Sequence, residues 1–306
     1  MPNMNELLAT APFDLYELSL FHLVVKHRSF TKAAEAAGVT QSAITRQMQG
    51  MEDSLGIDLL ERTTRSVRIT KAGEFLFQES IKLLGDVDQS LRRLKEDFAN
   101  AQKEIRIGVS RSMSPAYLPG FFHANLRRGL KVSYRVVSQP SADILSSLEA
   151  NELDLGVLAP PSRLPKTLVV THRFTDAFTL VAASEAALRF AQLSKPARLA
   201  WLQKQQWLLL TESTNTGVAL RKWMARAGLK IVPAMQLDSF DLIITLVSLG
   251  MGVSFVPKRA LALHGQKRNL VRLRLPDEFK RELAVVMRKH RKRPPHLTEF
   301  IQNILF

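Results

Sequence analysis

The apolar positions of residues 41–55 repeat at helical spacing. Ile44, Met48, Met51 and Leu55 are separated by four, three and four positions, which places them on one buried face of a helix. The other face carries side chains of the kinds that hydrogen-bond base edges and phosphates in a DNA groove, namely Gln41, Ser42, Thr45, Arg46 and Gln49. Every amphipathic helix has a polar face, so this helix alone leaves its function open.

A second, shorter helix is predicted just before it. Residues 31–37 are alanine-rich, and small side chains allow two helices to cross closely. Gly38 supplies a left-handed residue that ends this helix, and Thr40 is suited to cap the next one. The pattern predicts a helix, a tight turn and a second helix.

A basic hairpin follows the two helices. Residues 59–70 read as two short extended runs around a polar turn, and Arg62, Arg65 and Arg68 are spread across the turn and its flanks. A basic hairpin beside a helix with a polar face is typical of a wing, so these residues together indicate DNA binding.

The string SFTKAAEAAGVTQSAITRQMQGMEDSLGIDLLERTTRSVRITKAG, from Ser29 to Gly73, resembles the winged helix-turn-helix of LysR-type transcriptional regulators. The resemblance implies that the groove-facing residues are Gln41, Ser42, Thr45 and Arg46. It also implies a phosphate contact at Thr31 and a wing arginine, Arg65, that reaches toward the minor groove. Position 42 is often proline in the family, and we expect serine there to preserve binding.

Residues 71–98 are rich in helix formers and free of proline, with an apolar stripe at spacings of three and four: Leu84, Val87, Leu91, Leu94 and Phe98. Such a stripe could pack on its own domain, but its regularity between two domains favours pairing with a second chain. In the resembling family this helix pairs the subunits, so that two recognition helices meet two half-sites. The family commonly forms tetramers as pairs of dimers, and the sequence leaves dimer or tetramer open.

After residue 103 strand and helix signals alternate. Strands are expected at 105–109, 132–137, 153–158, 178–182, 207–210, 232–237, 253–256 and 283–287, with helices at 116–128, 142–150, 217–227, 242–249 and 296–304. This alternation predicts two α/β lobes joined by two crossovers, and it resembles the effector-binding domain of the same family. The expected fold is thus α/β with an all-α-type winged helix-turn-helix head.

The expected organisation has four parts. Residues 1–13 form an N-terminal extension, 14–70 the winged helix-turn-helix, 71–98 the linker helix and 104–306 the effector-binding domain. Within that domain, lobe I comprises 104–173 and 270–306, and lobe II comprises 174–269.

A ligand site is expected where strand ends and helix starts of both lobes converge, because free N–H groups and helix dipoles there favour an anion. The candidates are the polar residues at those ends: Ser110, Arg111, Ser112, Ser114, Ser138, Gln139, Thr211, Ser213, Thr214, Asn215 and Thr216. Serine and threonine at such positions are also ordinary helix caps. Arg111 is suited to clamp a carboxylate, although it could equally point to solvent.

The net charge of +15 is unevenly distributed. Residues 1–103 carry a net charge of −1 and residues 104–306 one of +16, so basicity in the DNA-reading half must be local, at its few arginines. The basic run at 288–293 is read as a solvated surface, with a DNA-backbone contact or a preference for anionic ligands as the alternatives.

The chain has no cysteine, which excludes disulfides and thiolate metal sites, and its seven histidines lack metal-ligand spacing. His22 and His27 are expected in the first helix, partly buried or at the surface. No secretory signal, apolar run of about 18 residues, catalytic serine motif or phosphate-binding glycine loop is evident. We therefore expect a cytoplasmic protein without a cofactor, metal or enzymatic activity.

The interpretation is a regulator that binds double-stranded DNA, associates with itself and responds to a small-molecule effector, for which an anion is one expectation. Two alternatives remain at this stage: a solute-binding module whose helical head serves protein contacts, and a DNA-binding protein whose cleft takes no effector. The basic hairpin disfavours the first alternative. A ligand titration would distinguish the second alternative from an effector-controlled regulator.

Overall fold

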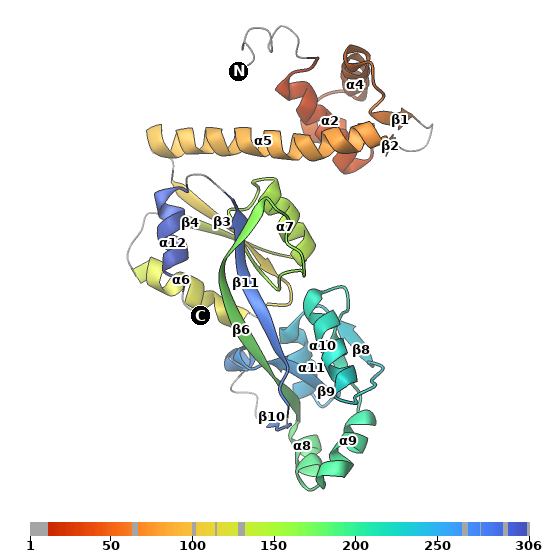
Figure 1. The fold of residues 1–306 in the computed structure, drawn as a ribbon, viewed down its shortest axis with the longest axis vertical. Helices are drawn as coiled ribbons and strands as arrows, with labels where there is room; N and C mark the ends of the chain where they lie inside the picture. Colours follow the sequence, from red (N-terminus) through yellow and green to blue (C-terminus); the bar gives the residue numbers. More distant parts are fainter. Residues whose placement is uncertain are drawn as a thin grey trace. The chain divides into compact units, whose positions relative to one another are not determined.

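The computed structural model describes residues 12–62, 67–99, 102–113, 115–127, 132–264, 269–275, 277–289 and 293–304. The chain divides into two compact units, Met1–Asn100 and Ala101–Phe306. Figure 1 labels most of the helices and strands of both units. Among the described helices, none combines the length and the apolar character that crossing a membrane requires.

In the described part of the first unit, three helices precede the wing: α2 (Leu15–His27), α3 (Phe30–Ala37) and α4 (Gln41–Leu55). Asp14 and Glu17 form a reciprocal capping box at the start of α2. Gly38 ends α3 with a φ of 69°, and the Thr40 side chain accepts a hydrogen bond from the N–H of Ala43 at the start of α4. The predicted turn is confirmed at both residues.

The buried face of α4 is also confirmed. Ile44, Met48 and Met51 are buried with Phe21 of α2 in one core, and Leu55 packs against it. The small Ala33 and Ala34 of α3 lie in the same core, which allows the helices to approach closely. His22 is partly buried and stacks on Phe77, whereas His27 is exposed.

The wing hairpin consists of β1 (Leu60–Arg62) and β2 (Val67–Ile69), which pair antiparallel. Its start is fixed by the buried Glu52 of α4, whose Oε1 accepts hydrogen bonds from the backbone N–H groups of Leu59 (2.8 Å) and Leu60 (2.9 Å). Because one carboxylate satisfies two strand donors, the recognition helix and the wing are positioned together.

Helix α5 (Lys71–Phe98) has the bounds predicted for the linker helix. Thr70 caps it by accepting from the N–H of Gly73, and the Thr70 hydroxyl donates to the carbonyl of Asp58 at 2.8 Å. A Cβ on Gly73 would lie 2.1 Å from the carbonyl oxygen of Leu59, so only glycine allows α5 to approach the wing this closely.

The described part of the second unit is built on a mixed sheet of seven strands: β3 (Lys103–Ser110), β4 (Val132–Gln139), β5 (Leu155–Leu158), β6 (Leu168–Ala183), β9 (Val253–Pro257), β10 (Leu270–Leu273) and β11 (Lys280–Arg288). The order is β10-β6-β11-β5-β3-β4, and β9 also pairs with β6. Strand β3 is parallel to β4 and β5, whereas β11 is antiparallel to β5 and β6.

The described residues of this unit also form η1 (Pro115–Tyr117), α6 (Leu118–Arg127), α7 (Ser141–Glu149), α8 (Ser184–Ala191), α9 (Lys195–Gln203), β7 (Leu208–Leu210), α10 (Asn215–Arg226), β8 (Met235–Leu237), α11 (Phe240–Ser248), η2 (Arg259–His264) and α12 (Pro295–Gln302). In lobe I, α6 and α12 share one core with the sheet, and α7 packs in a separate core. Lobe II has its own core around Trp207, Phe240 and Phe255.

Two long strands join the lobes. In Figure 1, β6 and β11 lie side by side, and their pairing extends from Leu168–Arg288 at one end to Ala177–Lys280 at the other. The predicted strand at 178–182 is therefore the end of a 16-residue strand that runs through the expected lobe boundary at 173/174.

Several predicted elements need correction. Residues 232–237 were expected to form a strand, but only Met235–Leu237 do, because Pro233 has no N–H to donate to a ladder. Residues 270–275 were expected in lobe I, but Leu270, Leu273 and Leu275 pack in the core of lobe II. The sequence pattern did not indicate α8 and α9, which are short and amphipathic.

Candidate functional site

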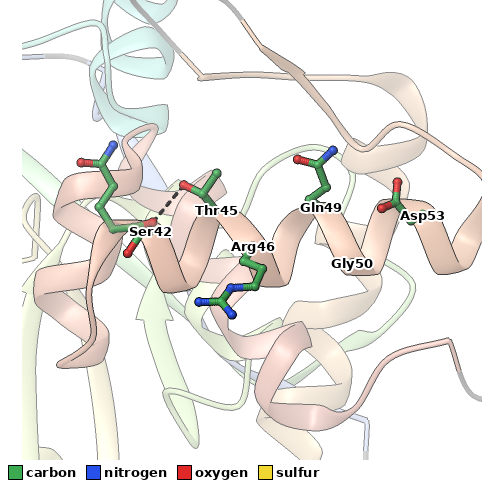
Figure 2. A pocket seen from close by; sticks show the side chains of 7 residues that line it. Ser42, Thr45, Arg46, Gln49, Gly50 and Asp53 are labelled. Carbon is green, nitrogen blue, oxygen red and sulfur yellow. Dashed lines mark hydrogen bonds between the residues drawn. The ribbon is translucent and has the colours of Figure 1, made fainter.

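The first candidate surface is the polar face of α4. Gln41, Ser42, Arg46 and Gln49 are exposed and Thr45 is half-buried, and together with Gly50 and Asp53 they line one shallow hollow. Figure 2 shows the labelled side chains of this row on successive turns of the helix. The five predicted residues of this helix thus share one surface.

Arg46 is the charged hydrogen-bond donor of this row. Among the described residues, Arg46 makes no ion pair, and its guanidinium can donate to an acceptor from outside. The Thr45 hydroxyl donates to the backbone carbonyl of Gln41 at 2.9 Å, so it presents its methyl group and an oxygen acceptor. The row offers both donors and acceptors, as base edges require.

Asp53 was not among the sequence-predicted residues, although it continues the same row four positions after Gln49. Its exposed carboxylate would repel a nearby phosphate. The helical spacing that identified the other residues could have found it.

Thr31 lies at the start of α3, and the structure brings it close to α4. Its hydroxyl oxygen lies 3.4 Å from the side-chain oxygen of Gln41. Thr31 is exposed, so the first helix of the motif and the polar row of α4 present adjoining polar groups.

In the wing, Arg68 is exposed on β2 opposite Glu61 of β1. Arg62 ends β1, but its side chain lies outside the described part of the structure, as does the whole of Arg65.

The apolar stripe of α5 divides into two groups. Leu91, Leu94 and Phe98 are 53%, 56% and 82% exposed, and Val87 is half-buried. Leu84 differs from the prediction, because it is partly buried against the core of the first unit. Phe75 and Leu83 of the same helix are also exposed, although they lie outside the predicted stripe.

The second candidate site is a cleft of about 310 Å³ between the lobes of the second unit. Its predicted lining residues are Ser110, Arg111, Ser112, Ser213, Thr214 and Asn215. The others were not predicted: Pro140, Ser141, Ala142, Leu145, Pro161 and Asp238. Lobe I and lobe II both contribute, as expected for a ligand site at strand ends.

The remaining predicted residues have other positions. Gln139 accepts a hydrogen bond from the N–H of Arg111 through its backbone carbonyl, and Ser138 is exposed on β4. Thr211 accepts from the Thr214 hydroxyl through its carbonyl, which holds the turn before α10. Thr216 is buried below the cleft, and Ser114 lies outside the described residues.

Two polar contacts between described residues cross the cleft. The Arg111 guanidinium of lobe I lies 3.7 Å from the Asp238 carboxylate of lobe II, and the two side chains are 52% and 58% exposed. The Asn215 side-chain amide donates to the carbonyl of Ala159 at 2.9 Å. Helices α7 and α10 begin at this cleft, so their positive dipole ends come from opposite lobes.

A buried ion pair supports the floor of the cleft. Arg281 of β11 and Asp176 of β6 have side chains only 3% and 1% exposed, with Nη2 and Oδ2 2.8 Å apart. Nη1 of Arg281 donates to the carbonyl of Ser112 in lobe I and to the hydroxyl of Thr216 in lobe II, both at 3.0 Å. One guanidinium therefore ties both walls of the cleft to the joining strands.

Aromatic rings surround this ion pair. The Arg281 guanidinium lies 5.2 and 5.3 Å from the ring centres of Phe178 and Phe240. Burial and then the neighbouring Asp176 carboxylate raise the pKa of the Tyr117 phenol, which keeps it neutral. Among the described residues, no group of three or more His, Asp or Glu side chains is placed to hold a metal ion.

A recognition-type helix with a wing and a two-lobed α/β unit with a cleft between its lobes define a DNA-binding protein that carries a ligand-binding domain. Residues 15–74 match the family model described as "Bacterial regulatory helix-turn-helix protein, lysR family", and residues 99–305 match "LysR substrate binding domain". The chain belongs to the LysR family of transcriptional regulators, and it is a regulator and not an enzyme.

Known relatives agree with this assignment. The chain is 29% identical over 271 residues to the HTH-type transcriptional regulator BenM of Acinetobacter baylyi, covering 86% of each protein. The crystal structure of CbnR, a LysR family transcriptional regulator, has the same fold with a TM-score of 0.65 at 20% identity, covering 95% of this chain and 98% of CbnR. Full-length CbnR in complex with its target DNA has a TM-score of 0.61 at 21% identity, covering 95% of this chain and 99% of that one.

Proposed function

We propose that α4 reads base edges in the major groove through Gln41, Ser42, Thr45, Arg46 and Gln49, with Thr31 and the wing arginines Arg62, Arg65 and Arg68 holding the DNA backbone and minor groove. The observation that carries this proposal is the continuous row on α4, which is exposed except at the half-buried Thr45 and in which Arg46 has no acidic partner among the described residues. Phosphate contacts would position the helix, and the row would supply sequence discrimination.

LysR-type regulators bind DNA and small-molecule effectors and form oligomers. For this chain we propose that the winged head comprises residues 14–70, the linker helix 71–98 and the effector-binding domain 104–306. The exposed Leu91, Leu94 and Phe98 support α5 as the pairing surface, because apolar side chains this exposed gain from burial against a second copy. Two such dimers would then associate into a tetramer. The protein would act in the cytoplasm, where the DNA lies.

The effector is proposed to bind in the interlobe cleft through Ser110, Arg111, Ser112, Thr214 and Asn215. Arg111 and the starts of α7 and α10 favour a ligand with an anionic group. Binding would alter the closure of the lobes and so the placement of the paired heads. Such a ligand must bind one arrangement more tightly than the other, because equal affinity shifts nothing.

The test is selection of bound fragments from the source genome with the purified full-length protein, followed by titration of the best fragment with salt and competitor DNA. We expect enrichment of a spaced, nearly palindromic site whose binding survives competition. Weak binding of all fragments that disappears with added salt would contradict the proposed reading of bases.

A further inference from the structure

The interlobe cleft contains one charge of each sign among its described lining residues. Arg111 comes from the end of β3 in lobe I, and Asp238 follows β8 in lobe II. The rest of the described lining is uncharged and includes the hydroxyls of Ser110 and Ser112, whose oxygens are 3.2 Å apart. The charges of the described lining are therefore balanced, in contrast to the net +16 of residues 104–306.

The two charges contact each other only weakly. Their closest atoms are 3.7 Å apart and both side chains are about half exposed, so solvent screens the pair. Little binding free energy would therefore be spent in separating Arg111 from Asp238, if the ligand offers each side chain a better partner. Both groups can thus serve as ligand-recognition groups as well as a link between the lobes.

A simple anion fits only one side of this cleft. Its carboxylate would be attracted by Arg111 and the dipoles of α7 and α10, but it would lie a few ångströms from the Asp238 carboxylate. A simple amine would have the opposite conflict with Arg111. A ligand with a carboxylate and an ammonium group on neighbouring atoms satisfies both side chains at once.

We propose that the effector is a compact zwitterion of the α-amino acid class, with its carboxylate on Arg111 and its ammonium on Asp238. The cleft volume of about 310 Å³ suits a ligand of this size. Because the two side chains belong to different lobes, such a ligand bridges the lobes and stabilises their closed arrangement. This inference rests on the proposed role of the cleft as the effector site, and it identifies Asp238 as the specificity-determining residue.

The experiment uses full-length protein and sets of three matched probes: each proteinogenic α-amino acid, its N-acetyl derivative and its decarboxylated amine. Calorimetric and thermal-shift titrations are expected to show binding of at least one amino acid. Its two derivatives should bind roughly 10- to 100-fold more weakly, because each lacks one charge-assisted hydrogen bond.

Two variants separate the contributions of the charges. Asp238→Asn should abolish the preference for the amino acid over its N-acetyl derivative, whereas Arg111→Gln should weaken binding of both. Asp277→Asn, an exposed carboxylate outside the cleft lining, is the matched control and should bind as the wild type does.

Three results would overturn the inference. An N-acetyl derivative could bind the wild type as tightly as its amino acid, or the preference for the amino acid over that derivative could persist in Asp238→Asn. The third is no binding by any amino acid at 10 mM, roughly the weak limit for a specific small ligand. None of these would refute the regulator itself, whose proposed function fails only if sequence-specific DNA binding or the response to every effector class is absent. The two failures are therefore distinguishable.

Discussion

The buried ion pair between Arg281 and Asp176 makes a sharp prediction about stability. In an Arg281→Met variant the Asp176 carboxylate, 1% exposed, would remain buried without its cation. The variant would also lose the donor to the Ser112 carbonyl and the Thr216 hydroxyl. Both walls of the cleft would then lose their hydrogen bonds to Arg281 of β11.

The expected cost is about 3–5 kcal/mol, the usual penalty for removing one partner of a buried pair. For a unit of roughly 200 residues, each kcal/mol lowers the melting temperature by about 2–4 °C, so the expected fall is about 6–20 °C. All three tryptophans, Trp201, Trp207 and Trp223, lie in the second unit, so their fluorescence follows the melting of this unit in the full-length protein.

Two further variants test the cause. Arg173 and Glu282 form an exposed ion pair on the same two strands, and Arg173→Met should cost no more than about 1 kcal/mol. The double variant Arg281→Met with Asp176→Leu should recover most of the lost stability, because replacing both partners of a buried pair with apolar residues is often neutral. Two results would contradict this account of the buried pair: a melting temperature of Arg281→Met equal to that of Arg173→Met, or a double variant no more stable than Arg281→Met alone.

Four other predictions follow from the first unit. Arg46→Ala should weaken specific DNA binding by about 1–3 kcal/mol in a competition assay, and an equal loss on all sequences would make Arg46 a phosphate contact instead. Asp53→Asn should tighten binding roughly 2- to 10-fold by removing a repulsive carboxylate, and unchanged affinity would place Asp53 away from the DNA. Leu91→Asp should split the dimer in analytical ultracentrifugation, whereas a surviving dimer would mean that α5 is not the pairing surface. Gly73→Ala should cost about 1–3 kcal/mol, seen as faster hydrogen exchange at 59–73, because its Cβ would overlap the Leu59 carbonyl; wild-type exchange would contradict that close approach.

The helix-turn-helix could be predicted from the sequence because its signals are local. Gly38, Thr40 and the stripe from Ile44 to Leu55 each act within a few positions of the chain, and the structure has each in its expected role. The linker helix was equally clear. The sequence did not show which residues of its apolar stripe pack on the first unit and which stay exposed. Periodicity is the same for Leu84, which packs against the core of its own unit, and for Leu91, which is exposed.

The cleft was predicted only in part because its residues come from distant segments. The strand ends indicated Ser110 and Arg111, which line the cleft. Asp238, however, follows a strand of only three residues, and no local pattern associates it with Arg111. The same holds for Arg281, which lies within a strand yet bonds to residues 169 and 65 positions away. Such contacts depend on the pairing of β6 with β11, which periodicity does not specify.

The most direct test of the central claim is affinity cleavage of DNA from α4. Because the chain contains no cysteine, Asp53→Cys, on the same row of α4 as the proposed base-reading residues, provides a single attachment point for an iron chelate that cuts nearby DNA. On the selected site we predict two clusters of cuts in the major grooves of two half-sites, separated by about one helical turn or a multiple of it, and none from the wild-type protein treated identically. A conjugate that binds the site but leaves those grooves uncut would contradict the assignment of α4 as the helix that reads DNA.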